Sequence, residues 1–226
     1  MSTQPRTARG TRTRARLLAA AEKVFASAGY HDASIVKITE EAGIGLGTFY
    51  LYFAGKQEIF DEVVGDLNAR VRHAMTEAAR TAATRIDVER AGFQAFFRFT
   101  AEHPALYRII RQAEFVSPAA QRRHYENIVR SYVQGLSAAQ DAGEVRPMDP
   151  EVAAWALMGM GELFGMRYIL WEAEDLGGDA ASPKPTDVPD EVLDELMEFI
   201  RRGLAPAPPA AGSRPVEGQR EDSKHA

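Results

Sequence analysis

The 226-residue sequence contains no cysteine. This absence excludes disulfide bonds, thiolate catalysis and cysteine-ligated zinc, and it leaves the redox compartment undetermined. The histidines show no spacing typical of metal ligands, and neither a glycine-rich phosphate loop nor a nucleophile motif is found. We therefore expect that the protein is not an enzyme and that it binds neither a metal nor a cofactor. The five histidines are His31, His73, His103, His124 and His225.

Long apolar runs are missing as well. No segment is long and apolar enough to cross a membrane, and the first residues lack the apolar core of a signal peptide. The alternation of apolar and polar residues that is typical of strands is also absent, whereas apolar residues recur at helical spacing. We predict an all-α protein of about nine helices, located in the cytoplasm and without membrane contact.

Residues 34–56 have the pattern of two short helices joined by a glycine turn. Ser34 predicts an N-cap, and the apolar residues that follow it fall on one stripe of a helix. Gly43 ends this helix, because such a turn commonly needs a residue with positive φ. An aromatic second helix follows, and Lys56 begins a further one. This is the layout of a helix-turn-helix that binds DNA.

The side chains of the second helix divide into a buried face and a face for DNA. Phe49 and Phe53 are four residues apart and should pack on the core. The spacing of Thr48, Tyr52 and Lys56 predicts that these three share another face, suited to phosphates and base edges. A tyrosine there can bury its ring and still direct its hydroxyl outward. The residues expected to bind DNA are Lys37, Gly47, Thr48, Tyr50, Tyr52 and Lys56.

The charge is distributed unevenly along the chain. The net charge is −5, yet the first 60 residues hold eight lysines and arginines against five acidic residues. Residues 1–16 hold five arginines and no acid. We predict a flexible basic arm over residues 1–13, which either reaches the DNA backbone or a minor groove or is a solubilising tail without defined contacts.

These segments resemble the DNA-binding domain of the TetR family of bacterial one-component regulators. The resemblance extends from about residue 14 to residue 60. It implies a DNA-binding domain over 14–60, followed by a helical effector-binding and dimerisation domain over 61–204. The matching segments are Leu17–Tyr30, Ile38–Ala42, Gly47–Phe53 and Lys56.

Three positions differ from the usual family pattern. Ala33 stands where threonine is common, and Thr39 stands where a small alanine is common. Gly45 replaces the serine or threonine that usually caps the recognition helix, so only its backbone N–H remains to contact phosphate.

The rest of the chain predicts further helices joined by short turns. Ser117-Pro118 and Asp149-Pro150 are typical pairs of an N-cap and a first helical residue. Residues 176–188 predict a loop, and the tail 205–226 should be disordered. The predicted helices cover residues 56–84, 87–102, 104–114, 117–142, 149–171 and 189–204.

The segment 155–171 is apolar nearly all round, which predicts burial on every side. Its glycines 159, 161 and 165 would allow another helix to approach closely. The family resemblance implies that the helices over 149–171 and 189–204 pair with those of a second subunit in a four-helix bundle. The alternative is an internal core helix.

Aromatic and flexible side chains from several helices of the same domain could line an apolar cavity or simply fill the core. Arg108, Arg111 and Glu162 stand out in this apolar context, because a carboxylate there must be paired, hydrogen-bonded or exposed. An arginine is a candidate partner of Glu162 or a clamp for a ligand. A surface or intersubunit ion pair would also explain Glu162. The wider apolar set includes Ile128, Trp155 and Leu163. The candidate ligand-binding residues are Phe93, Phe96, Phe97, Tyr107, Arg108, Ile110, Arg111, Phe115, Tyr125, Tyr132, Met158, Glu162 and Met166.

The resemblance implies a homodimeric regulator, most simply a repressor that a small effector releases from a palindromic operator. Residues 103–111 and 159–171 are more loosely similar to TetR regulators associated with lipid or aromatic metabolism. That similarity implies an apolar or amphipathic effector such as a fatty acyl-coenzyme A, although aromatic metabolites, drugs and small lactones would suit the same pocket. The alternative function is a helical protein-protein adaptor or dimeric scaffold with weakened DNA binding.

Overall fold

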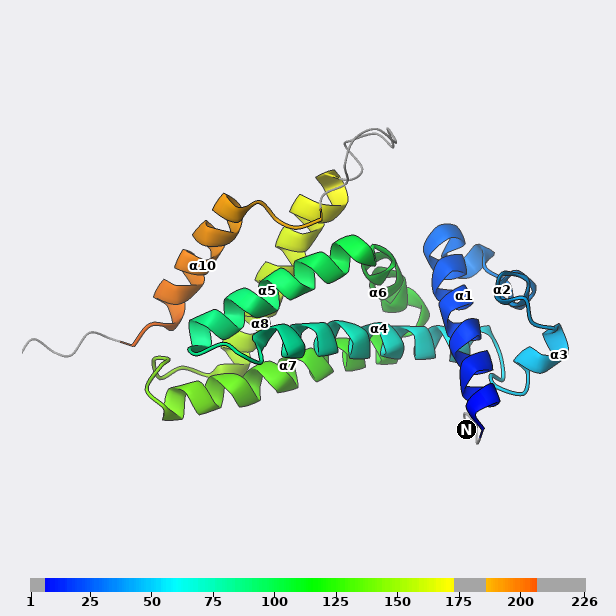
Figure 1. Cartoon of the computed structure of the whole chain (residues 1–226), viewed down its shortest axis with the longest axis horizontal. Coiled ribbons are helices and arrows are strands. Elements are labelled where there is room, and N and C mark those ends of the chain that lie inside the picture. Colours follow the sequence, from blue (N-terminus) through cyan, green and yellow to red (C-terminus); the bar gives the residue numbers. More distant parts are fainter. Residues whose placement is uncertain (1–6, 173–185, 207–226) are drawn as a thin grey trace, which may run out of the picture.

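The computed structural model describes residues 7–172 and 186–206, and within these ranges it is built of helices without strands (Figure 1). The all-α prediction is confirmed for this part of the chain. The helices are α1 (Ala8–Asp32), α2 (Ile35–Ala42), α3 (Leu46–Phe49), α4 (Lys56–Ala79), α5 (Arg85–Glu102), α6 (Ala105–Val116), α7 (Pro118–Asp141), α8 (Pro150–Gly165), the π-helical turn η1 (Met166–Trp171) that continues α8, and α10 (Asp190–Leu204).

The helices form an elongated molecule with α3 near one end and α10 towards the other (Figure 1). Helices α1, α2 and α3 gather at the first end, and α4 leads away from them along the length of the molecule. Helices α5 and α7 pack against α4, and α8 packs against α7. None of the helices in the described ranges is long and apolar enough to cross a membrane.

Helix α2 and the turn after it form as the sequence predicts. The Ser34 side chain accepts a hydrogen bond from the Lys37 N–H at 3.1 Å, which caps the helix. Gly43 ends it with φ of 59°, a left-handed conformation that favours glycine. Helix α3 is shorter than predicted and covers Leu46–Phe49, because the chain turns before Lys56 begins α4.

The basic arm begins its helix earlier than predicted. Helix α1 starts at Ala8, where the Thr7 side chain caps it by accepting a hydrogen bond from the Gly10 N–H at 3.1 Å. The prediction of a flexible arm is therefore wrong for residues 8–13, since alanine and arginine favour helix and a threonine cap precedes them. Residues 1–6 lie outside the described residues.

The predicted helix over 56–84 ends at Ala79, because Thr84 caps the next helix instead. Thr84 and Asp87 form a reciprocal capping box, each side chain bonding the other's backbone N–H at 3.2 Å. Asp149 caps α8 as predicted, whereas Ser117 precedes α7 without a capping bond from its side chain. The predicted loop lies outside the described residues except for 186–188, and so does the tail from residue 207 onward.

Two groups of buried apolar side chains hold the helices together. The first core joins α1, α2 and α3 with α4, α6, Phe99 of α5 and Ala120 of α7. The second core joins α5, α7, η1 and α10 with Ala153, Ala154 and Leu157 of α8. The first core includes Val63 and Ile109, so its packing continues past residue 60, where we predicted a domain boundary.

A buried ion pair links two turns of α5. The Arg85 Nε donates to Glu89 Oε1 at 2.8 Å, and the Glu89 side chain is only 1% exposed. Burial raises the pKa of the Glu89 carboxyl, while Arg85 opposes that shift. A Cβ atom at Gly135 of α7 would overlap the Arg85 guanidinium, so a side chain there would require Arg85 to move.

Two of the three glycines in α8 face their own subunit. A Cβ atom at Gly165 would lie 2.7 Å from the Tyr107 hydroxyl, and one at Gly161 would lie 3.3 Å from the Phe93 ring. These two glycines let α8 approach α5 and α6, so the predicted close approach of another helix is confirmed at Gly161 and Gly165. Gly159 has no neighbouring atom within 4 Å of such a position.

Replacing Gly165 by alanine should therefore strain the packing of α8. We expect Gly165→Ala to lower the free energy of unfolding by about 1–3 kcal/mol, because the Tyr107 hydroxyl must move. Urea denaturation measures this change. Gly65→Ala in α4 is the matched control, because it has open space and should leave stability unchanged or raise it by up to about 1 kcal/mol. An equal effect of both substitutions would contradict the close approach.

Candidate DNA interface and effector pocket

Helix α3 and the turn that follows it divide their aromatic residues between core and surface. Phe49 and Phe53 are buried, as the spacing predicts. Tyr50 is 55% exposed, whereas the Tyr52 ring is partly buried against the first core. Thr48 is half-buried, and Gly47 is exposed with no atom within 4 Å of a Cβ position. Tyr50 and Gly47 therefore present the freest surface among the candidate residues of this segment.

The Lys56 side chain faces the end of α1. Its ammonium donates to the carbonyl oxygens of Tyr30 at 2.8 Å and Ala33 at 2.9 Å, and it lies 4.4 Å from the centre of the Tyr30 ring. The expectation that Lys56 shares a face with Thr48 and Tyr52 is therefore wrong. The turn before residue 56 places this lysine at the start of α4, from where its ammonium reaches the C-terminal end of α1. A positive charge is favourable at that end of a helix.

A polar groove lies between α1 and the start of α3. Arg9, Arg12 and Arg16 recur at helical spacing along α1 and line the groove together with Thr13, Ile44, Gly45 and Thr48. Arg16 is held in place because its guanidinium donates to the Ala42 carbonyl at 2.6 Å. We did not predict these arginines as site residues. The signal was their i, i+3, i+7 spacing, which marks one face of a helix.

The three departures from the family pattern have distinct structural settings. The Ala33 carbonyl accepts the Lys56 bond described above. Thr39 is buried, and its hydroxyl donates to the Val36 carbonyl at 2.9 Å. Gly45 provides no side-chain cap for α3. Lys37, another candidate for DNA, is exposed, and its ammonium bonds the Asp32 carbonyl at 3.0 Å.

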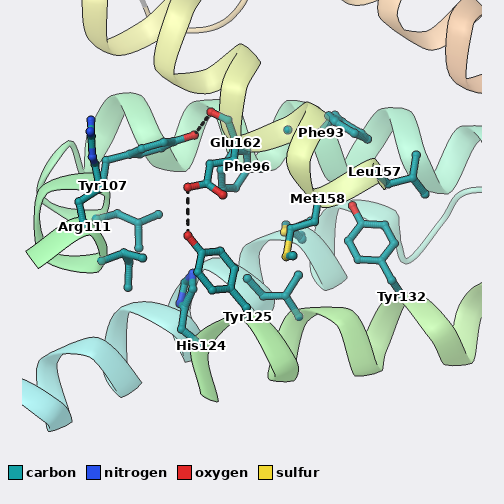
Figure 2. A pocket seen from close by; sticks show the side chains of 15 residues that line it. Phe93, Phe96, Tyr107, Arg111, His124, Tyr125, Tyr132, Leu157, Met158 and Glu162 are labelled. Atoms are coloured by element: carbon teal, nitrogen blue, oxygen red, sulfur yellow. Dashed lines mark hydrogen bonds between the residues drawn. The ribbon is translucent and has the colours of Figure 1, made fainter. Parts of the chain in front are cut away.

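An apolar pocket opens among α4, α5, α6, α7 and α8 (Figure 2). Its cavity measures about 60 Å³, which leaves room for only a few water molecules. The pocket is lined by Met75, Phe93, Phe96, Leu106, Tyr107, Ile110, Arg111, His124, Tyr125, Ile128, Tyr132, Leu157, Met158, Gly161 and Glu162.

Most candidate ligand-binding residues meet in this pocket, and four do not. Phe97 belongs to the second core, and Met166 is partly buried outside the lining. Arg108 and Phe115 lie on the opposite face of α6, and Phe115 is 82% exposed. The helical period explains the error, because it separates these two residues from those of α6 that face the pocket. The candidates that line the pocket are Phe93, Phe96, Tyr107, Ile110, Arg111, Tyr125, Tyr132, Met158 and Glu162.

Two tyrosines hold Glu162 within the pocket (Figure 2). The Tyr125 hydroxyl donates to the Glu162 carboxylate at 3.0 Å, and the Tyr107 hydroxyl donates to its backbone carbonyl at 2.6 Å. Burial and the nearby Glu162 charge raise the pKa of both tyrosines, so they retain their protons. The expectation of an arginine partner is wrong, because Tyr125 is the partner of this carboxylate and Arg111 lies exposed at the edge of the pocket.

His124 connects the pocket to α4. The Asn68 side-chain amide of α4 lies 3.1 Å from His124 Nδ1 and donates to the His124 carbonyl at 3.0 Å. Burial lowers the pKa of His124 to about 4, so the imidazole is neutral at pH 7. We did not predict His124, Asn68 or the lining residue Met75, because their apolar or isolated sequence context does not distinguish them from core.

Helix α6 joins the pocket to α1 through its other face. Gly29 interrupts α1 with φ of 75°, and the Gln112 side chain accepts a hydrogen bond from the next backbone N–H, that of Tyr30, at 2.6 Å. Arg108 donates to the Ala26 carbonyl at 3.4 Å. The end of α1 therefore exchanges hydrogen bonds with the helix that lines the pocket.

Large apolar side chains are exposed along α8, η1 and α10. Val152 is 67% exposed, Leu163 is 60% exposed and Phe199 is 66% exposed. Trp155 and Trp171 are also exposed. Apolar residues gathered on neighbouring helices in this way are typical of a protein-protein contact.

Comparison with known proteins agrees with this architecture. Residues 17–63 match the family model described as bacterial regulatory proteins of the tetR family. The chain is 31% identical over 179 residues to YdgC of Bacillus subtilis, an uncharacterized transcriptional regulator of the helix-turn-helix type, covering 76% of this chain and 89% of that protein. The chain belongs to the TetR family. It is accordingly a DNA-binding transcriptional regulator, and TetR regulators bind operators and act as dimers.

Other transcriptional regulators are similar over most of the chain. A second Bacillus subtilis regulator, YhgD, is 29% identical over 163 residues, covering 70% of this chain and 83% of that protein. The solved structure of FadR from Bacillus subtilis in complex with stearoyl-CoA has a TM-score of 0.68 at 20% identity, covering 84% of this chain and 98% of that one. The likeness to the FadR structure shows a shared fold alone.

The contacts of Lys56 predict a structural role for this residue. We expect Lys56→Met to lower the free energy of unfolding by about 1–3 kcal/mol, because carbonyl groups at the end of α1 lose a charged donor. Chemical denaturation measures the change. Lys23→Met, at an exposed ion pair with Glu41, should change stability by less than about 1 kcal/mol. Equal free energies of unfolding for the Lys56 and Lys23 variants would contradict a structural role for Lys56.

Proposed function

We propose that this TetR regulator is a homodimeric repressor that binds a palindromic operator and leaves it when a small effector enters the pocket. One observation carries the proposal: α6 lines the pocket with one face and bonds the end of α1 with the other. A regulator of this kind acts on bacterial DNA, so we place it in the cytoplasm.

The DNA interface in this proposal combines α3 with the groove beside it. Arg9 and Arg12 contact phosphates, since arginine suits phosphate oxygens. Thr48 and Tyr50 reach base edges in the major groove, and Gly47 allows the backbone to approach. Lys37 and the Tyr52 hydroxyl complete the contacts expected from the sequence. Lys56 acts indirectly, because its ammonium is engaged with α1.

The dimer interface in this proposal is the exposed apolar surface of α8 and α10. Val152 and Phe199 also border a groove between these helices, next to residues that include Met160. Burying this surface against its copy around a two-fold axis places two recognition helices on one side of the dimer. Two such helices read half-sites about one helical turn apart, or a multiple of it.

Effector binding acts through α6 and α4. The cavity is small, so an effector has to move the wall residues apart. Displacement of α6 moves the hydrogen bonds of Arg108 and Gln112 to α1, and displacement of α7 moves the bond of His124 to Asn68 in α4. A change in the distance between recognition helices then favours release, because the half-sites have fixed spacing.

The effector in this proposal is small and apolar or amphipathic. An acyl-coenzyme A is one candidate, supported by the related FadR structure, which holds stearoyl-CoA, and by the looser sequence similarity. Aromatic metabolites are another, supported by the rings that line the pocket. The cavity admits a compact ligand with less rearrangement than a long acyl chain requires.

An adaptor or dimeric scaffold with weakened DNA binding is the second candidate function. The missing side-chain cap at Gly45 favours it, because the first turn of α3 is held only by its backbone. Tight, salt-dependent binding to DNA from upstream of the chain's own gene separates the two candidates, since a scaffold with weakened DNA binding would bind that DNA much more weakly.

Substitutions in the DNA interface should weaken operator binding without unfolding the protein. We expect Tyr50→Ala to reduce affinity for the upstream DNA by about tenfold or more, because a base or phosphate contact is worth about 1–3 kcal/mol. Arg12→Ala should also reduce the slope of the logarithm of affinity against the logarithm of salt concentration by about 1, because one phosphate contact is lost. Fluorescence anisotropy at several salt concentrations measures both effects. Arg122→Ala in α7 is the control, and unchanged binding by Tyr50→Ala and Arg12→Ala would contradict the interface.

A charge on the apolar surface of α10 should separate the subunits. We expect Phe199→Asp to convert the dimer to a monomer at micromolar concentration, because the carboxylate would be buried without a partner. Light scattering coupled to gel filtration measures the mass. Phe115→Asp is the matched control, since Phe115 is equally apolar and 82% exposed on α6. If the dimer persists in Phe199→Asp but is lost in Phe115→Asp, the interface lies on α6 and not on α10.

A further inference from the structure

The effector pocket has an acidic polar group within apolar, aromatic walls. Glu162 directs its carboxylate into the space between α6 and α7, near Phe96 and Tyr125 (Figure 2). One carboxylate oxygen accepts a hydrogen bond from the Tyr125 hydroxyl. A carboxylate in apolar surroundings is stabilised by further donors or by a positive charge.

No side chain that lines the pocket forms an ion pair with Glu162, although the Arg111 charge lowers the pKa of Tyr125 against the larger effect of burial. All the lining side chains lie in the described part of the chain, and Arg111 is the only lysine or arginine among them. Arg111 is exposed, and Figure 2 shows its guanidinium at the edge of the pocket, away from the Glu162 carboxylate. His124 is neutral at pH 7, because burial lowers its pKa to about 4. The carboxylate therefore faces the cavity with a neutral hydroxyl as its partner.

The aromatic walls favour the same sign of ligand charge. The face of an aromatic ring is electrically negative, so it attracts a cation held within about 6 Å and repels an anion. Buried tyrosine hydroxyls keep their protons and add no negative charge of their own, because burial raises the pKa of Tyr107 and Tyr125. The rings that line the pocket are Phe93, Phe96, Tyr107, Tyr125 and Tyr132.

We propose that the pocket binds organic cations: an amine or quaternary ammonium group attached to a compact apolar body. The cation contacts Glu162 and the rings of Tyr107 and Tyr125, while the apolar body lies among residues such as Ile110 and Met158. This inference rests on the proposed role of the pocket as the effector site. Acyl-coenzyme A thioesters, whose coenzyme A group is anionic, become the competing outcome of the test.

The experiment compares three ligands of equal chain length on the full chain: n-octylammonium, octanoate and octan-1-ol. Isothermal titration calorimetry gives the affinities, and tryptophan fluorescence provides a second readout because the Trp155 ring lies 6.3 Å from that of Tyr125. We expect octylammonium to bind at least about tenfold more tightly than octanoate, as a desolvated ion pair and ring contacts imply.

Substitutions assign the preference to the carboxylate. Glu162→Gln should weaken octylammonium binding about tenfold and leave octan-1-ol unchanged, because the amide still accepts the Tyr125 hydroxyl but carries no charge. Glu126→Gln, at a position of α7 outside the pocket, should leave all three affinities unchanged. Tyr125→Phe, which frees the carboxylate from its internal donor, should retain the preference for the cation.

The outcomes separate this inference from the proposed function. Three results would overturn the inference. Octanoate could bind as tightly as octylammonium, the Tyr125→Phe variant could lose the preference for the cation, or Glu162→Gln could leave the octylammonium affinity unchanged. Failure of octylammonium to bind at all would also overturn it. The function of the pocket is judged by anisotropy on upstream DNA: a bound ligand that leaves DNA affinity unchanged would refute effector control while the cation preference stands.

Discussion

The interrupted end of α1 is held by side chains from two other helices, and the arrangement of the whole molecule depends on it. Gly29 breaks the helix, which leaves carbonyl groups that need donors. Lys56 supplies a charged donor from α4, and Arg108 supplies another donor from α6. The Lys56 ammonium also lies against the Tyr30 ring. The same few bonds therefore terminate a helix, fix the start of the long α4 and tie the pocket wall to the DNA-binding end.

Local signals in the sequence predicted the parts that depend on local chemistry. Ser34, Gly43 and Asp149 act as cap, turn and cap, because their effects involve only neighbouring backbone. The buried faces of Phe49 and Phe53 follow from helical spacing alone. Most of the pocket was also foreseen, since aromatic residues that recur on several amphipathic helices tend to meet where those helices pack.

What the sequence did not predict depends on contacts between distant segments. Lys56 resembles a DNA-facing lysine until the turn before it is known, and Arg85 and Glu89 resemble an exposed i, i+4 pair although they are buried. The partner of Glu162 is a tyrosine on another helix. Spacing within one helix fixes which residues share a face, but it does not say which face meets which neighbour.

The first core has a consequence for how regulators of this family can be recombined. Its apolar side chains come from both sides of residue 60, including Val63 of α4 and Ile109 of α6. A fragment cut at residue 60 would expose the surface that these residues cover, and a foreign partner would have to match it. The smallest portable DNA-reading unit of this chain therefore spans at least α1 to α6, and exchanging it carries the pocket residues of α4, α5 and α6 along with the recognition helix.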